Sequence, residues 1–252
     1  GLIFLRDPVS SQVEDAHGSA LDRVSAFQMG FAGGGDQCAA IDMAEIEKRQ
    51  GDLPRQLTYD AFGEPVLDSP IDEDTLSKLM QVLGDIYQLR NPPALSMKEP
   101  DCPTAPGTVP TSYCASSNTI HVDLPVLKAA GEPKTEEEDE VLLQGDNTAL
   151  SMVTSRYALA VQQERGVKLD TPTAALRTAC LTGMAQGQMT DEAGFDFVLS
   201  PGDADEAVSG LLTNPVVASD VNGLPAPAGF TRILAYRLGL SSNADQCFQR
   251  FS

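Results

Sequence analysis

Positive charge is scarce in this sequence. Its 17 Lys and Arg residues stand against 36 Asp and Glu residues, which gives a formal net charge of −19 over 252 residues. Nucleic acid binding needs clustered cations that neutralise phosphates, and adsorption to an anionic membrane surface needs them too. We therefore expect no nucleic acid partner, and we attribute the negative charge mainly to solubility.

Long apolar runs are also missing. No stretch approaches the roughly 18 uninterrupted apolar residues of a membrane span, and no signal peptide is visible after Gly1. We expect no membrane span within this chain, and any targeting segment would lie upstream or have been removed. With 42% apolar residues, the chain can still bury a core of ordinary size.

Familiar metal and catalytic motifs are absent as well. The five cysteines form no C-x-x-C pair, and the two histidines, His17 and His121, lie in different regions. Gly33–Asp36 lacks the Lys of a phosphate loop and reads as a helix-ending turn. The acidic run Glu136–Glu140 lacks the regular ligand spacing of a calcium loop. No G-x-S-x-G elbow is present, and we expect no cofactor and no bound metal.

What the sequence does contain is an internal repeat. Leu21–Cys38 (LDRVSAFQMGFAGGGDQC) aligns without a gap on Phe230–Cys247 (FTRILAYRLGLSSNADQC), and both copies end in Asp-Gln-Cys. A second block of matches adds Gly1, Phe4 and Pro8, which fall on Gly194, Phe197 and Pro201. We interpret the repeat as a duplicated terminal subdomain.

The repeat suggests a division of the chain. Residues 1–38 are expected to be the tail subdomain of an upstream duplicated domain, residues 39–69 a connector, and residues 70–252 a nearly whole domain. The unpaired Cys38 would then find its disulfide partner in the upstream part of the same protein.

Local signals predict a mainly helical α+β fold with a small sheet. Helices are expected to begin at Ser69-Pro70, at Asp146 or Asn147, at Thr171-Pro172 and at Ser200–Asp203, where capping residues precede apolar stripes. Alternating apolar residues predict a strand over 118–124. Residues 91–117, rich in Pro, Ser and Thr, are expected to form a loop closed by a disulfide.

In this order, the pieces resemble the bacterial neutral zinc metallopeptidase family over roughly residues 75–252, and again over 1–38. The matching pieces are Val82–Asp85, Tyr113-Cys114, Thr119–Leu124, Leu176–Met184, Ser200–Asp203 leading into Glu206-Ala207, and Arg232–Cys247. The resemblance implies a zincin-like, disulfide-stabilised domain that is extracytoplasmic, either secreted or membrane-anchored. Alongside it we expect the pairs Cys102–Cys114 and Cys180–Cys247.

The zinc site of that family is not matched. The positions that would carry H-E-x-x-H hold Ser155, Arg156, Tyr157, Ala158 and Leu159. Two imidazoles on one helix face are needed to reach one zinc ion, and the glutamate between them handles the proton of the metal-bound water. Ala175 and Ala179 stand where acidic residues would be expected on the next helix. We therefore expect a pseudoenzyme without zinc.

Three functions follow as hypotheses. The first is a pseudopeptidase that binds a protein or peptide partner in the cell envelope, through a groove lined by Arg156, Tyr157 and His121. The strand at 118–124 would accept an extended chain by strand addition. The second is a regulatory or stabilising half of a zinc metallopeptidase whose active site lies upstream of Gly1. The third is a structural subunit of a membrane-anchored assembly.

Overall fold

The computed structural model describes residues 2–3, 6–7, 18–50, 53–54, 59, 62–63, 68–104, 108–139, 141–190 and 193–252. Gly1, Phe4, Pro8 and His17 lie outside these described residues, as do Glu140 and parts of the expected connector. The protein is a mixed α+β structure, mostly helical, with a three-stranded sheet.

The elements follow one another along the chain with short connections. The α-helices are α1 (Ala20–Ala39), α2 (Met43–Gln50), α3 (Glu73–Tyr87), α4 (Leu124–Ala130), α5 (Glu136–Asp139), α6 (Asp146–Glu164), α7 (Pro172–Gln186), α8 (Asp203–Thr213), α9 (Gly229–Leu240) and α10 (Ala244–Arg250). The strands are β1 (Ala94–Ser96), β2 (Thr111–Cys114) and β3 (Thr119–Val122), and a 3₁₀-helix, η4, spans Pro215–Ala218.

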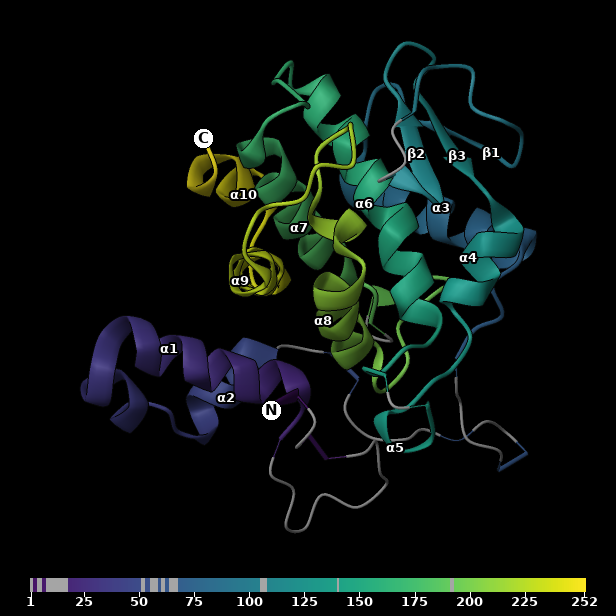
Figure 1. The fold of residues 1–252 in the computed structure, drawn as a ribbon. Coiled ribbons are helices and arrows are strands. Elements are labelled where there is room, and N and C mark those ends of the chain that lie inside the picture. The colour runs from purple at the N-terminus through teal and green to yellow at the C-terminus, as the bar shows by residue number, and fades with distance from the viewer. Residues whose placement is uncertain are drawn as a thin grey trace.

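Helix α6 forms the centre of the main body. It contacts the sheet, α3 and α4 on one side, and α7, α8 and η4 on the other (Figure 1). Every residue from Asp146 to Gln162 is buried. A helix that is buried all round cannot keep a solvated polar face. Most of its polar side chains therefore find partners inside the protein, while Asp146 Oδ1 and the Tyr157 hydroxyl have none among the described residues.

The sheet has the order β1-β3-β2, with β1 parallel and β2 antiparallel to β3. The expected strand at 118–124 is shorter, because Asp123 caps the N-terminus of α4 and accepts a hydrogen bond from the Val126 amide. Since β3 lies between two strands, its backbone has no free edge, and the expected strand addition at 118–124 is wrong. The segment 91–117, expected to be a loop, contributes both outer strands.

Helices α6, α7 and α8 begin at the expected positions, whereas α3 begins later than expected. Thr171 caps α7 with Pro172 at its first turn, as expected. Helix α3 starts later than Ser69, because the Asp72 carboxylate accepts the Thr75 amide hydrogen bond at 2.9 Å. Glycines, rather than the expected polar residues, occupy the N-cap positions of α6 and α8. The carboxylates of these first turns are therefore available for other contacts.

Both expected disulfides are confirmed. Cys102 bonds to Cys114, and Cys180 bonds to Cys247, which ties α7 to α10. Disulfides persist in oxidising compartments, so the structure is compatible with an extracytoplasmic domain. Within the described part of the chain, no helix has the length and apolar character that crossing a membrane requires.

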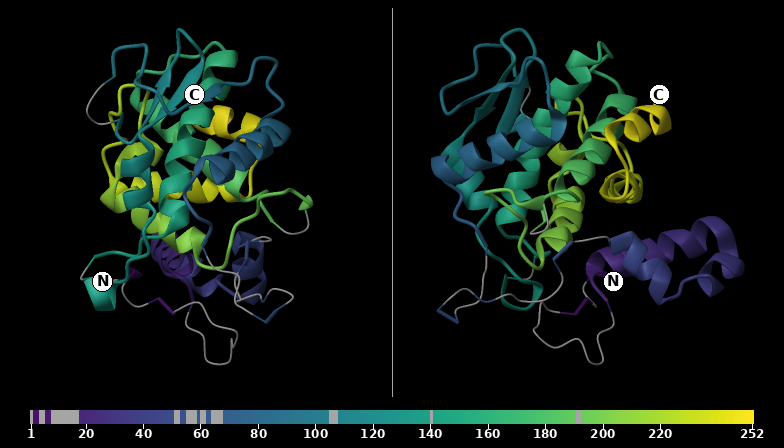
Figure 2. Two further views of the ribbon diagram at one scale, coloured as in Figure 1. Left: turned by 90° about the vertical axis from the view of Figure 1, so that its right-hand side faces the viewer. Right: turned by 180° about the vertical axis from the view of Figure 1, so that it is seen from behind.

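Helices α1 and α2 form a separate layer beneath the main body, and the far half of α1 extends away from it (Figure 2). Its near half contacts α8 and α9. Gly34 has φ 70° and breaks the helix, as the glycine turn predicts, but a short helical segment follows it. Helix α2 lies inside the stretch that the sequence suggested was a connector.

Candidate functional site

Residues 155–159, where the resemblance would place the zinc motif, lie in the buried middle of α6. The Arg156 side chain is fully buried and donates hydrogen bonds to the Val216 carbonyl oxygen at 2.6 Å and to Ser219 Oγ at 3.0 Å. It also contacts the Asp220 carbonyl oxygen. Burial lowers the pKa of Arg156 to about 10, so the guanidinium remains charged at neutral pH. Arg156 thus fastens η4 and the following loop to α6.

Tyr157 points the other way, towards α3. Its ring stacks on that of Tyr87 with centroids 5.5 Å apart, and its hydroxyl is buried without a hydrogen-bond partner among the described residues. Burial raises the pKa of Tyr157 to about 12. Because Arg156 and Tyr157 are both fully buried, neither lines an open groove in this structure, contrary to the expectation.

The other residues at the expected zinc-motif positions are also unable to bind a metal ion. Ser155 Oγ donates to the Met152 carbonyl oxygen at 2.6 Å, and Ala158 and Leu159 are fully buried. Ala175 and Ala179 of α7 are also fully buried and offer no donor atom. These residues do not fit a zinc ion, which needs imidazole, thiolate or carboxylate ligands.

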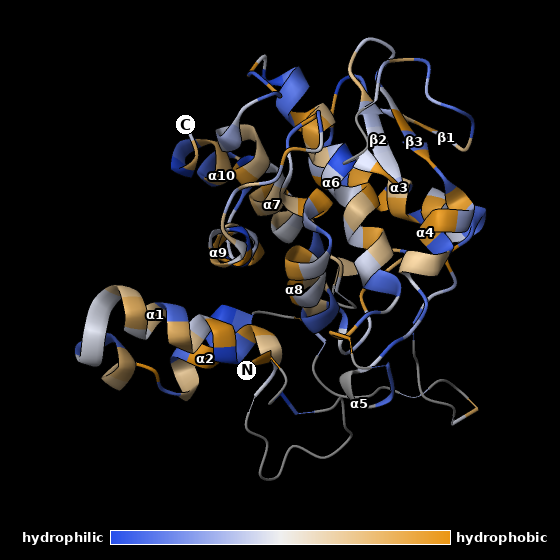
Figure 3. Ribbon diagram, in the orientation of Figure 1, coloured by the Kyte–Doolittle hydropathy of each residue, from blue (hydrophilic) through white to orange (hydrophobic). Residues whose placement is uncertain are grey.

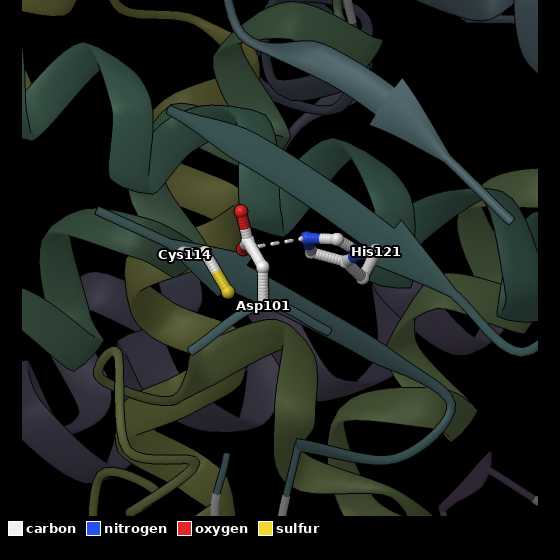
Figure 4. A group of neighbouring side chains, drawn as sticks. All are labelled: Asp101, Cys114 and His121. Carbon is white, nitrogen blue, oxygen red and sulfur yellow. Dashed lines mark hydrogen bonds and ion pairs between the residues drawn. The ribbon is translucent and has the colours of Figure 1, made fainter. Parts of the chain in front are cut away.

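His121, the third expected groove residue, lies on β3 with Asp101 and Cys114 nearby (Figure 4). Its Nε2 is 3.3 Å from Asp101 Oδ1, and its Nδ1 is 3.1 Å from the Lys98 carbonyl oxygen. A thiolate could complete a metal site here, but Cys114 is bonded to Cys102. The histidine therefore holds the disulfide loop against the sheet.

A second group of acidic residues was not predicted from the sequence. Asp146 at the start of α6, and Asp203 and Glu206 at the start of α8, are buried next to one another, and Asp68 adjoins them from the surface. Burial and mutual repulsion raise the pKa of Asp146 to about 6 and that of Glu206 to about 9. The pKa of Asp203 is raised well above its ordinary value by the same causes.

The structure also shows which helices form the two copies of the repeat. Helix α1 with its break at Gly34 corresponds to α9 followed by α10, and Gly34 aligns with Asn243, the N-cap of α10. Both copies therefore consist of a long helix, a break and a short cysteine-bearing helix. The duplication of the subdomain stays a prediction from the sequence.

The environments of the two copies differ sharply. Helix α9 packs along α7 at close range, since a Cβ at Gly239 would clash with the Cys180 backbone, and one at Gly183 with that of Tyr236. Tyr236 is fully buried and donates a hydrogen bond to Gln186 Oε1 at 2.5 Å. Within the described residues, no helix packs along the matching face of α1 as closely, although Phe230 of α9 packs edge-on against Phe27.

The difference in burial between the two copies is clear at three positions of α1. Phe27 of α1 is 47% exposed, whereas Tyr236, its counterpart, is fully buried. Phe31, which matches the partly buried Leu240, is 83% exposed. Cys38 is a free, exposed thiol. Apolar positions thus continue along α1 into the part that projects from the main body (Figure 3).

Comparison of the chain with protein-family models, with curated proteins and with solved structures found no match in any of the three. The resemblance to zinc metallopeptidases therefore stays a prediction from the sequence.

Proposed function

We propose that this chain is a catalytically inactive, metallopeptidase-like domain of an extracytoplasmic protein, and that it acts by binding a protein partner. The exposure of Phe27, Phe31 and Cys38, which together with the half-buried Gly30 define one face of α1, carries the proposal. Equivalent residues of α9 and α10 are covered by α7. Contiguous exposed apolar residues on a small protein often mark an interaction surface.

The partner that suits this face is a helix of the same kind as α7, presented by a second domain of the same family. On α7, Cys180 forms the disulfide to α10, while Gly183 and Gly187 allow the α9 backbone to approach closely. A helix with a cysteine followed by two such glycines would cover Gly30 and place a thiol near Cys38. We place this helix in the upstream part of the same protein, as the duplication suggests.

A neighbouring apolar pocket extends the proposed interface. A depression of about 440 Å³ lies where α1 meets α9, and its walls include Val24, Phe27, Phe230 and Ile233. Phe27 packs edge-on against Phe230, with ring centroids 5.3 Å apart, and stacks on Phe31 on its other side. A partner that covered α1 would also bury the rim of this pocket.

Disulfide mapping of the native protein tests whether Cys38 is bonded to a cysteine of the proposed partner. The protein would be alkylated, digested without reduction and analysed by mass spectrometry, with Cys102–Cys114 and Cys180–Cys247 as internal controls. We expect the Cys38 peptide to be linked to a cysteine peptide outside this chain. Recovery of Cys38 as an alkylated free thiol, with both control disulfides intact, would overturn the proposed partner.

Metal analysis and peptidase assays test the proposed lack of zinc-dependent peptidase activity. We expect no stoichiometric zinc in the purified chain and no zinc-dependent hydrolysis of an unfolded protein substrate, because no imidazole is present at 155–159. One zinc ion per chain, together with chelator-sensitive hydrolysis, would contradict the proposal. An intact H-E-x-x-H in the partner domain would instead favour a regulatory or stabilising half of an active peptidase.

A further inference from the structure

Asp68, Asp146 and Glu206 come from three separate segments, yet their carboxylate oxygens lie within 4.8 Å of one another. Calcium binds oxygen ligands at about 2.3–2.6 Å, so two ligand atoms on opposite sides of one ion are about 5 Å apart. All three carboxylates can therefore reach one ion without a change of backbone. The distances between these carboxylate oxygens suit the binding of a single metal ion.

The side chains of this acidic cluster are turned into the protein rather than into water. Asp146 is 2% exposed and Glu206 is 5% exposed, and Asp146 Oδ1 is buried with no hydrogen-bond partner among the described residues. An unpaired buried carboxylate oxygen costs free energy unless something supplies positive charge. Among the described residues, the side-chain group that could donate to Asp146 is the neighbouring carboxyl of Asp203, and it can do so when it carries a proton.

Two other carboxylate oxygens of the cluster are held in place by backbone amide donors. Asp146 Oδ2 accepts from the Ser69 amide at 2.5 Å, and Glu206 Oε2 accepts from the Asn147 amide at 2.9 Å. Such outer contacts orient ligands in metal sites. The carboxylates are therefore positioned before any ion arrives.

Asp203 lies behind these ligands. It accepts from the Ser200 amide at 2.8 Å and from Ser200 Oγ at 2.7 Å. Both of its oxygens therefore have a protein donor, so Asp203 adds negative charge to the site without being needed as a ligand.

Positive charge from the protein is missing at this place. Within the described part of the chain, no ion pair joins a Lys, Arg or His to Asp68, Asp146, Asp203 or Glu206. The charged groups that act on one another here are these four acids themselves. Buried like charges persist only if they bind protons or a cation.

We propose that Asp68, Asp146 and Glu206 bind one calcium ion, with Asp203 as an additional negative charge behind them. The ligands are all oxygens, which favours a hard cation over zinc or copper. Asp68 is exposed and opens the site to solvent. The ion would join the segment before α3 to the first turns of α6 and α8, and so stabilise the fold. Affinities of about 10⁻⁴–10⁻³ M are usual for calcium modules outside the cell.

The test compares calcium binding to the metal-free full chain and to matched variants. We expect one calcium ion per chain by isothermal titration calorimetry, a higher melting temperature in calcium, and a much smaller effect of magnesium at the same concentration. Asp146→Asn should lower the calcium affinity at least tenfold. Glu138→Gln, which removes one exposed acidic group of α5, is the control and should leave the affinity unchanged.

A second variant keeps the test decisive if Asp146→Asn does not fold. Asp68 is exposed, so Asp68→Asn should fold normally and still weaken calcium binding several-fold. Folded wild-type chain that binds no calcium at 10 mM, roughly ten times the weakest expected dissociation constant, would overturn the proposal. So would calcium binding that survives in both variants. The result is independent of the α1 partner, because Cys38 mapping and calcium titration report on different surfaces.

Discussion

The Arg156 guanidinium donates a 2.6 Å hydrogen bond to the carbonyl oxygen of Val216, and the whole arginine side chain is buried. The guanidinium thus fastens η4 to the central helix, at the position that the predicted resemblance assigns to the general base of a zinc peptidase.

Arg156→Ala should destabilise the chain strongly. It would leave a cavity and remove the hydrogen bonds that Arg156 donates to the Val216 carbonyl oxygen and to Ser219 Oγ, so we expect a loss of roughly 3 kcal/mol or more in the free energy of unfolding. Arg165→Ala is the control, because Arg165 is 48% exposed and pairs with Asp245 at the surface. That variant should lose less than about 1 kcal/mol in urea unfolding. Equal losses would contradict the structural role of Arg156.

The two disulfides should contribute unequally to stability. Cys180 and Cys247 are separated by 67 residues, and Cys102 and Cys114 by 12. Chain-entropy arguments give about 4 kcal/mol for the longer loop and about 3 kcal/mol for the shorter one. We therefore expect Cys180→Ala/Cys247→Ala to lower the melting temperature more than Cys102→Ala/Cys114→Ala does. The opposite order would show that loop entropy is not the main contribution.

The sequence predicted those features that depend on local signals. Thr171-Pro172 places the start of α7 because a cap and a proline act within one turn. Both disulfides were predicted by the spacing and the family resemblance. The strands β1 and β2 were missed, because Ala94–Ser96 and Thr111–Cys114 are too short to show alternation and lie in a Pro-rich stretch.

The acidic cluster could not be found from the sequence for a different reason. Asp68, Asp146 and Glu206 are far apart in the chain and belong to three segments that only tertiary packing brings together. The polar residues at helix starts were interpreted as caps, which is their usual role. The useful signal would have been that Asp203 and Glu206 follow a glycine N-cap and lie on the face of α8 that packs against α6.

The metal-free chain should lose stability as the pH rises. The pKa of Asp146 is raised from 3.8 to about 6 and that of Glu206 from 4.5 to about 9, so the folded state holds protons that the unfolded state has released. Their stabilising effect is complete below about pH 4 and is lost as the pH passes through the folded values. The slope is at most about 1.4 kcal/mol per pH unit for each group.

Urea unfolding in a chelator between pH 4.5 and 8.5 measures this slope. Glu206→Gln should flatten it, because the amide cannot ionise, whereas Glu138→Gln should preserve it. A wild-type stability that stays level or increases with pH would show that the cluster does not hold protons in the folded state.

Gly30 of α1 and Gly239 of α9 occupy equivalent positions of the repeat but have different surroundings. A Cβ at Gly239 would clash with the Cys180 backbone, whereas one at Gly30 would meet only the Cys38 side chain, which can move. In the isolated chain, Gly239→Ala should therefore cost roughly 2–4 kcal/mol of overpacking strain or more. Gly30→Ala should be neutral, or stabilising by up to about 1 kcal/mol, because alanine favours helix over glycine.

The same substitution should have a different consequence in the presence of the proposed partner helix. If a helix like α7 covers α1, Gly30→Ala would push the two backbones apart and prevent Cys38 from reaching its partner thiol, as the close approach at Gly239 implies. We expect the variant to show full alkylation of Cys38, while the Cys180–Cys247 disulfide remains intact. Leu224→Ser, a change at a 65% exposed residue away from α1, is the control and should leave the pairing of Cys38 unaltered. A Gly30→Ala protein that still forms the Cys38 disulfide in full would show that the partner does not pack on α1 as α7 packs on α9.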